Sequence, residues 1–172
     1  MAVFTQSGRV VLAQALFDMP LFLAVGEGDP EWDNLSPPTT PEEQALRDAA
    51  LAVLTDLVSK VGVTRLREKF FVKPDSAGTI LMGDGSAYSQ SQTPTAHVFL
   101  RFQLDLPDAD GTTLRETGVF VGTQPAGTVP AGQTYIPAAD VTSFGTMIEV
   151  DRFAPIVRDG SIGQTFSFIL TM

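Results

Sequence analysis

The sequence has 172 residues, 44% of them hydrophobic, which is long and apolar enough to bury the core of a single domain. Its formal net charge of −9 excludes nucleic-acid binding of the usual basic kind, because the field of the protein would repel a polyanion. With no cysteine and one histidine, His97, the chain has no disulfide, no thiol nucleophile and little material for a zinc site or a hydrolase triad.

The first expected element is a helix over residues 5–18. Thr5 or Ser7 can cap it, its apolar residues recur at helical spacing, and Pro20 ends it. A short apolar strand, of the kind buried on both faces, is expected over residues 21–25. The chain therefore begins with a helix that leads into a core strand.

The apolar stretch 10–25 also raises the question of a signal peptide or a membrane span. Gln14, Asp18 and Pro20 interrupt it, and no small-residue cleavage site follows. It is also shorter than the roughly 20 apolar residues that a membrane span needs. We therefore expect a protein that is assembled in a cytoplasm and has no membrane partner.

A loop rich in Gly, Pro, Asp and Asn is expected over residues 26–40, and it carries the single tryptophan, Trp32. The capping box Thr40-Pro41-Glu42-Glu43 then predicts the start of an amphipathic helix. Gly62 is expected to end this helix after about five turns. Its apolar stripe, expected to pack on the rest of the protein, consists of Leu46, Ala50, Val53, Leu54, Leu57 and Val61.

From residue 63 onward, β-branched and aromatic runs alternate with turn residues. Strands are expected near residues 63–73, 78–82, 95–106, 112–122, 146–153 and 162–171. The stretch 123–145, rich in proline and glycine, is expected to be a long loop. The predicted fold class is α+β, with two N-terminal helices packed on a mainly antiparallel β-sheet or β-sandwich. It would be a single domain with a helical part over residues 1–62 and a β-rich part over residues 63–172.

No constellation of residues marks a catalytic, cofactor-binding or metal site. Asp105, Asp108 and Asp110 are followed by glycine in the wrong register for a calcium loop and predict a turn instead. Neither Gly26-x-Gly28 nor Gly83-x-Gly85 continues into a phosphate-binding motif. His97 is expected to be a strand histidine hydrogen-bonded to a neighbour. A non-enzymatic protein without cofactors is the prediction, and a hydrolase that uses a pair of its acidic residues stays an alternative.

The charges are unevenly distributed along the chain. Residues 60–73 hold five of the eleven basic residues, and Arg65, Arg67 and Lys69 would point to the same side of a strand. Residues 27–48 hold seven acidic residues and one basic residue, Arg47. The basic ridge and the acidic segment are either solvated or paired internally, or they dock neighbouring subunits, where charge sets orientation.

Several motifs, in order, resemble the N-terminal domain of phage tail-collar fibre proteins and related small tail or baseplate proteins. They are Thr5-x-x-Gly8 with the helix that follows, Ala24-Val25-Gly26-Glu27-Gly28, the tryptophan-containing loop and helix over residues 32–58, and Leu114-Arg115-Glu116-Thr117-Gly118-Val119-Phe120. The resemblance covers residues 5–122. It departs from the family pattern at Ser59-Lys60-Val61-Gly62, which stands where that family often has a Glu and an Arg.

The resemblance implies a virion structural protein of a tailed phage, a tail or baseplate adaptor or wedge-like component that is assembled in the host cytoplasm. Its implied partners are other tail or baseplate proteins, in a homo-oligomer or ring of three- or six-fold symmetry. The expected interface residues are Arg65, Arg67, Lys69, Trp32, Arg115 and Glu116.

Arg115 and Glu116 would face opposite sides of a strand, one toward an inner polar partner and the other toward a neighbouring strand or subunit. A cross-strand salt bridge is the alternative for this pair. For the whole chain, the alternatives are a head–tail connector component and a small carbohydrate- or ligand-binding β module that uses Trp32, Tyr88 and Tyr135.

Overall fold

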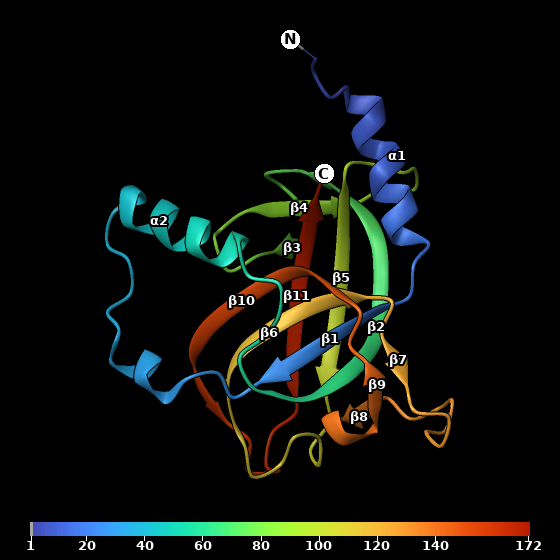
Figure 1. Ribbon diagram of the computed structural model, residues 1–172. Coiled ribbons are helices and arrows are strands. Elements are labelled where there is room, and N and C mark those ends of the chain that lie inside the picture. The colour runs from blue at the N-terminus through green and yellow to red at the C-terminus, as the bar shows by residue number, and fades with distance from the viewer. Residues whose placement is uncertain (1) are drawn as a thin grey trace. The chain divides into compact units, whose positions relative to one another are not determined.

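The computed structural model describes residues 2–172, which form two compact units of helices and mostly antiparallel strands (Figure 1). The first unit combines the N-terminal segment up to Pro20 with residues 66–103 and 165–172, and the second combines residues 21–65 with residues 104–164. The boundary falls within the long strand β2 (Lys60–Pro74). The α+β class predicted from the sequence is confirmed.

The first unit contains one helix and the strands that surround the second half of β2. Its other elements are α1 (Gln6–Phe17), β3 (Ile80–Leu81), β4 (Ala87–Gln90), β5 (His97–Leu104) and β11 (Gln164–Thr171). β2 pairs antiparallel with both β4 and β5, and β5 also pairs with β11. Thr5 caps α1 by accepting a hydrogen bond from the Gly8 amide, and the Phe17 ring stacks on Phe71 at 4.6 Å.

The second unit is built around β1 (Leu21–Gly26), every residue of which is buried. Its remaining elements are η1 (Pro30–Asn34), α2 (Pro41–Ala52), β6 (Thr113–Val121), β7 (Gln124–Pro125), β8 (Tyr135–Pro137), η2 (Ala138–Asp140), β9 (Val141–Ser143) and β10 (Thr146–Val157). β1 lies between the first half of β2 and β6, and β10 pairs with the far side of β6, at the sheet edge. The buried core cluster comprises Phe22, Ala24, Leu57, Val63, Phe120 and Ile136.

Most of the predicted elements are present. The helix and strand expected over residues 5–18 and 21–25 correspond to α1 and β1. The capping box is formed, since Thr40 Oγ1 accepts from the Glu43 amide at 3.2 Å and Glu43 Oε2 accepts from the Thr40 amide at 3.3 Å. The predicted strands correspond to β2, β3, β5, β6, β10 and β11, whereas β4 was not predicted.

The predicted end of the second helix was wrong. α2 stops at Ala52 instead of continuing to Gly62, and β2 already begins at Lys60. Its apolar stripe does not pack inward either, because α2 has no buried residue and Leu46 is 73% exposed. Leu57 is buried, but it lies beyond the helix. The helix ends early because the chain after it is held by the side chain of Glu116, which accepts hydrogen bonds from the Val58 and Ser59 amides.

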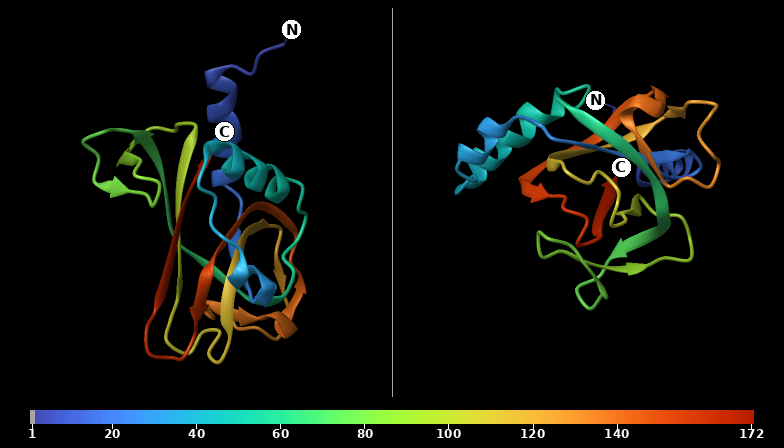
Figure 2. Two further views of the ribbon diagram at one scale, coloured as in Figure 1. Left: turned by 90° about the vertical axis from the view of Figure 1, so that its left-hand side faces the viewer. Right: turned by 90° about the horizontal axis from the view of Figure 1, so that it is seen from below.

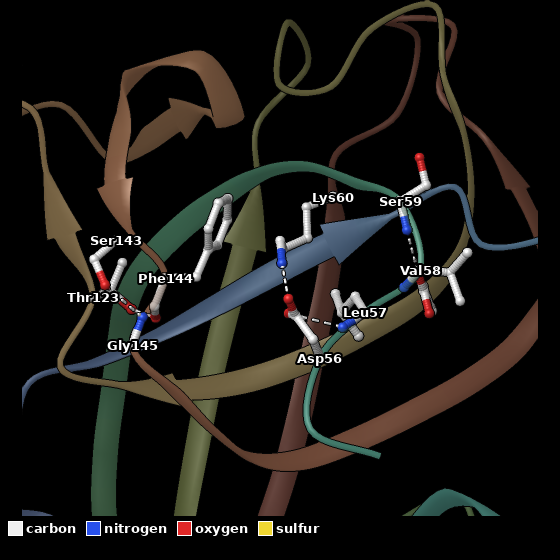
Figure 3. A network of polar contacts seen from close by, with 10 residues as sticks. Asp56, Leu57, Val58, Ser59, Lys60, Thr123, Ser143, Phe144 and Gly145 are labelled. Carbon is white, nitrogen blue, oxygen red and sulfur yellow. Dashed lines mark hydrogen bonds and ion pairs between the residues drawn. The ribbon is translucent and has the colours of Figure 1, made fainter.

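The stretch 123–145 was also predicted wrongly as a plain loop. β7 and β9 form a two-stranded sheet within it, and β8 pairs with β2, which places Ile136 in the core. Thr123 Oγ1 donates to the Phe144 carbonyl at 2.8 Å and so joins the two ends of this stretch (Figure 3).

Candidate functional site

The segment that joins β1 to β2 contributes little to the buried core of the second unit. We call residues 27–59, which include η1 and α2, the arm (Figure 2). Leu57 is the one buried residue in it. Four of its large apolar side chains are exposed: Leu35 by 69%, Leu46 by 73%, Val53 by 77% and Val58 by 62%. The arm therefore presents apolar surface to its surroundings.

Arg115 of β6 holds the start of the arm. Its Nε and Nη2 donate to the two carboxyl oxygens of Asp33 at 2.7 and 2.8 Å, and its Nη1 donates to the Glu27 carbonyl at 3.2 Å. This bidentate geometry is the strongest form of an arginine–carboxylate contact. The hydrogen bond from Arg115 lowers the pKa of Asp33 and raises the pKa of Arg115 itself.

Glu116, the next residue of β6, holds the end of the arm. Its side chain is fully buried, and Oε1 accepts hydrogen bonds from the amides of Val58 at 2.8 Å and Ser59 at 3.0 Å. Gly26 makes room for it, because a Cβ there would lie 2.7 Å from Glu116 Oε1. Close by, Asp56 and Lys60 form an ion pair in front of the strands (Figure 3).

Two adjacent residues of one strand thus fix both ends of the arm. Because neighbours on a strand face opposite sides, Arg115 reaches Asp33 while Glu116 points to the inner amides of Val58 and Ser59. The two glycines of Gly26-x-Gly28 serve the same purpose rather than phosphate binding. Gly28 has φ +61°, and a Cβ there would lie 2.3 Å from the ring of Trp32.

A groove of about 400 Å³ lies between η1, α2 and β10. Trp32 and Leu35 line it beside η1, Arg47 and Leu51 line it from α2, and residues 152–155 line it from β10. The Arg152 guanidinium lies 3.8 Å over the Trp32 ring, and Arg47 Nη2 donates to the Arg152 carbonyl at 2.7 Å. Within the described residues, Arg152 Nε is buried without a hydrogen-bond partner.

A second hollow, of about 340 Å³, lies between α2 and the start of β10. Asp48 and Glu149 are among its lining residues. Burial, reinforced by the charge of Asp151, raises the pKa of Glu149 to about 7. Burial also raises the pKa of Asp151, against the attraction of Arg47. Residues 2–172 contain no group of three or more potential ligands placed to hold a metal ion.

The residues of the predicted basic ridge contact their own units. Arg65 Nε donates to the Gln133 carbonyl at 2.9 Å, and its guanidinium lies 5.1 Å from the centre of the Phe22 ring. Lys69 donates to the carbonyl of Phe17 at the end of α1. Arg67 is exposed, and the register of β2 with β5 is irregular beside it, between Leu66 and Glu68. Strict alternation along β2 therefore does not describe this strand.

The remaining candidate residues have local roles. His97 Nδ1 lies 3.0 Å from Thr171 Oγ1, and burial lowers the pKa of this histidine. Asp108 accepts from the Asp105 amide within the predicted turn. Tyr88 packs beside His97 in the first unit. Burial raises the pKa of Tyr135, in β8, to about 12.

Sequence reasoning did not find Arg47, Arg152 or Asp33 as parts of the groove. A lone charge in a helix or strand carries no local signal of a site. Trp32 was the one usable indication, since a large apolar ring among acidic residues needs a partner, which is Arg152. Neither helix in the described part of the chain is long and apolar enough to cross a membrane.

Comparison with known families supports the resemblance to phage tail and baseplate proteins. A family model described as "Baseplate wedge 3 tail fiber network component" matches residues 1–172. The match therefore extends over the whole chain, beyond the part in which the motifs were recognised. A comparison with curated proteins found no match.

Proposed function

We propose that the chain, which belongs to the family of baseplate wedge 3 tail fiber network components, is an adaptor that joins neighbouring tail proteins in a symmetric assembly. The family name indicates a structural component of the phage baseplate. The finer proposal is that this component acts through protein–protein contacts rather than catalysis, and that it is assembled in the host cytoplasm into a ring of three- or six-fold symmetry.

The exposed apolar surface of the arm carries this proposal. Monomeric proteins rarely display contiguous apolar patches larger than a few hundred Å², and several exposed apolar side chains on one fixed segment are typical of an interaction site. Here Leu35, Leu46 and Val53 are largely exposed, yet both ends of the segment that bears them are tied to β6. An isolated helix as short as α2 is marginal in water, so a partner that covers its outer face would also stabilise it.

The basic residues on β2 take a secondary part in the proposal. Arg67 is the exposed residue of the three, whereas Arg65 and Lys69 are half-buried, so we assign Arg67 to orienting a neighbouring subunit. We assign the other three predicted interface residues to the docking role of the arm. Trp32 lines the groove, and Arg115 and Glu116 of β6 hold the arm in position.

Complementation of a phage that lacks the gene tests the proposal. Virions are purified, and the copy number of the chain is measured by quantitative mass spectrometry against the major tail-tube protein. We expect the wild-type chain at a fixed low copy number, in a multiple of three or six. The variant Leu46→Asp should fold normally, because Leu46 is exposed, but should be depleted from particles.

Leu81→Asp is the matched control, since Leu81 is 75% exposed but lies on β3 in the first unit. It should enter particles like the wild type. Absence of the wild-type chain from virions would overturn the proposed function. Equal incorporation of Leu46→Asp and wild type would show that the arm is not the docking surface.

A further inference from the structure

We infer that the groove between η1, α2 and β10 binds an extended segment of a neighbouring baseplate protein that carries one acidic side chain among apolar residues. The inference rests on the proposed function and specifies the chemistry of the partner. The acidic side chain would pair with Arg47 and Arg152, and a neighbouring apolar side chain would cover Leu35.

The charges of the groove favour a carboxylate. Arg47 and Arg152 both line it, and within residues 2–172 neither forms an ion pair with an acidic side chain. Asp33, the acidic residue of the lining, already accepts hydrogen bonds from Arg115 Nε and Nη2. The negative charges around Arg47 include Asp48, the next residue of α2, and Asp151 on β10, whose pKa the charge of Arg47 lowers against the effect of burial. A ligand carboxylate would therefore provide the direct partner that the two guanidinium groups lack.

The positions of the two arginines make the site ready for a ligand. The Arg152 guanidinium lies 3.8 Å from the centre of the Trp32 ring, and Arg47 Nη2 donates to the Arg152 carbonyl at 2.7 Å. Both contacts limit the rotamers available to these long side chains, so less conformational entropy is lost on binding. The two guanidinium groups are thus held in place for an anionic group.

The surroundings of the groove exclude a polyanion and favour a mixed peptide. Residues 27–48 carry seven acidic residues, which would repel a nucleic acid or a strongly acidic tail. Leu35, Leu51 and Trp32 also line the groove and suit apolar side chains. The groove also runs along β10, the strand at the sheet edge, where an extended segment has backbone to lie against.

The test begins with the purified full chain and an array of overlapping short peptides that tile the other tail and baseplate proteins of the same phage. We expect hits that share an acidic residue flanked by apolar ones. Affinity for a fluorescently labelled hit peptide is then measured by anisotropy. Arg47→Gln, at an exposed position that leaves the core intact, and Arg152→Gln should each weaken binding about tenfold, or about 1.4 kcal/mol.

Replacing the acidic residue of the peptide by its amide should weaken binding equally, and the loss should not add to that of Arg152→Gln. Arg9→Gln, at an exposed position of α1, is the matched control and should bind like the wild type. Hits without an acidic residue, unchanged binding by both groove variants, or no hit at all would overturn the inference. So would self-association through the groove, seen as a Trp32-dependent dimer by sedimentation.

These failures differ from a failure of the proposed function. If virions contain the chain but no acidic peptide binds the groove, the inference falls and the adaptor role remains. If virions lack the chain, the adaptor role itself falls.

Discussion

Replacing Glu116 by alanine should release the end of the arm from β6. In the folded protein, one oxygen of this fully buried carboxyl group accepts two amide hydrogens, from Val58 at 2.8 Å and Ser59 at 3.0 Å. Each lost hydrogen bond costs about 1–1.5 kcal/mol, and the truncated side chain also leaves a cavity. Together these losses predict that the free energy of unfolding falls by about 2–4 kcal/mol.

The assay is urea unfolding at neutral pH, together with hydrogen exchange of the Val58 and Ser59 amides, which should accelerate. Glu116→Gln keeps an acceptor oxygen and nearly the same volume, so it should lose much less stability. Thr117→Val is the neighbouring control, because the Thr117 hydroxyl is buried without a hydrogen-bond partner in the described chain, and its removal should cost nothing. If Glu116→Ala were as stable as the wild type and its amides were equally protected, the anchoring role of Glu116 would be refuted.

Three further predictions concern the arm and β10. Gly28→Ala places a Cβ at φ +61° and against the Trp32 ring, so it should lower the free energy of unfolding by about 1–3 kcal/mol and shift the tryptophan fluorescence emission. The control Gly85→Ala, at φ +84° in open space, should leave the emission unchanged. Asp33→Asn should be less stable than the wild type at neutral pH, because the pKa of Asp33 is lowered below 3.8 by Arg115, and the difference in unfolding free energy should vanish as the pH falls through that lowered pKa. Burial raises the pKa of Glu149 from 4.5 to about 7. The free energy of unfolding of the wild type should therefore fall by on the order of 3 kcal/mol as the pH rises from 4.5 to 7. Urea unfolding of Glu149→Gln should not show this loss.

The two ends of α2 show which part of a fold the sequence can predict. The start is encoded by four consecutive residues, Thr40-Pro41-Glu42-Glu43, whose capping contacts are local. The end depends on Glu116, which lies 58 residues beyond Val58 in the chain. Helical periodicity continued through Leu54 and Leu57, but the chain gains more from placing Leu57 in the core and its following amides on Glu116. Contacts of that range leave no trace in local spacing.

The candidate site was predictable to a similar extent. Arg115 and Glu116 were expected to face opposite sides of their strand, and they do, but their shared task of holding one segment depends on where that segment returns. Arg65 and Lys69 were expected to lie on one side of the strand as part of a basic ridge. Their charged groups lie over the rings of Phe22 and Phe17, because the face of an aromatic ring attracts a cation, and spacing along the strand does not reveal such partners.

The anchoring of the arm has a consequence for how a partner would bind. A long segment that was free at both ends would lose much conformational entropy on docking, and this loss would weaken the complex. Here Arg115 and Glu116 hold Asp33 at one end and Ser59 at the other, so a partner needs to order little more than the exposed side chains between them. Affinity for the arm should therefore depend on two β6 residues that need not touch the partner at all. Variants of this pair would weaken docking through the free arm, whereas variants of Leu46 would weaken it through the interface itself.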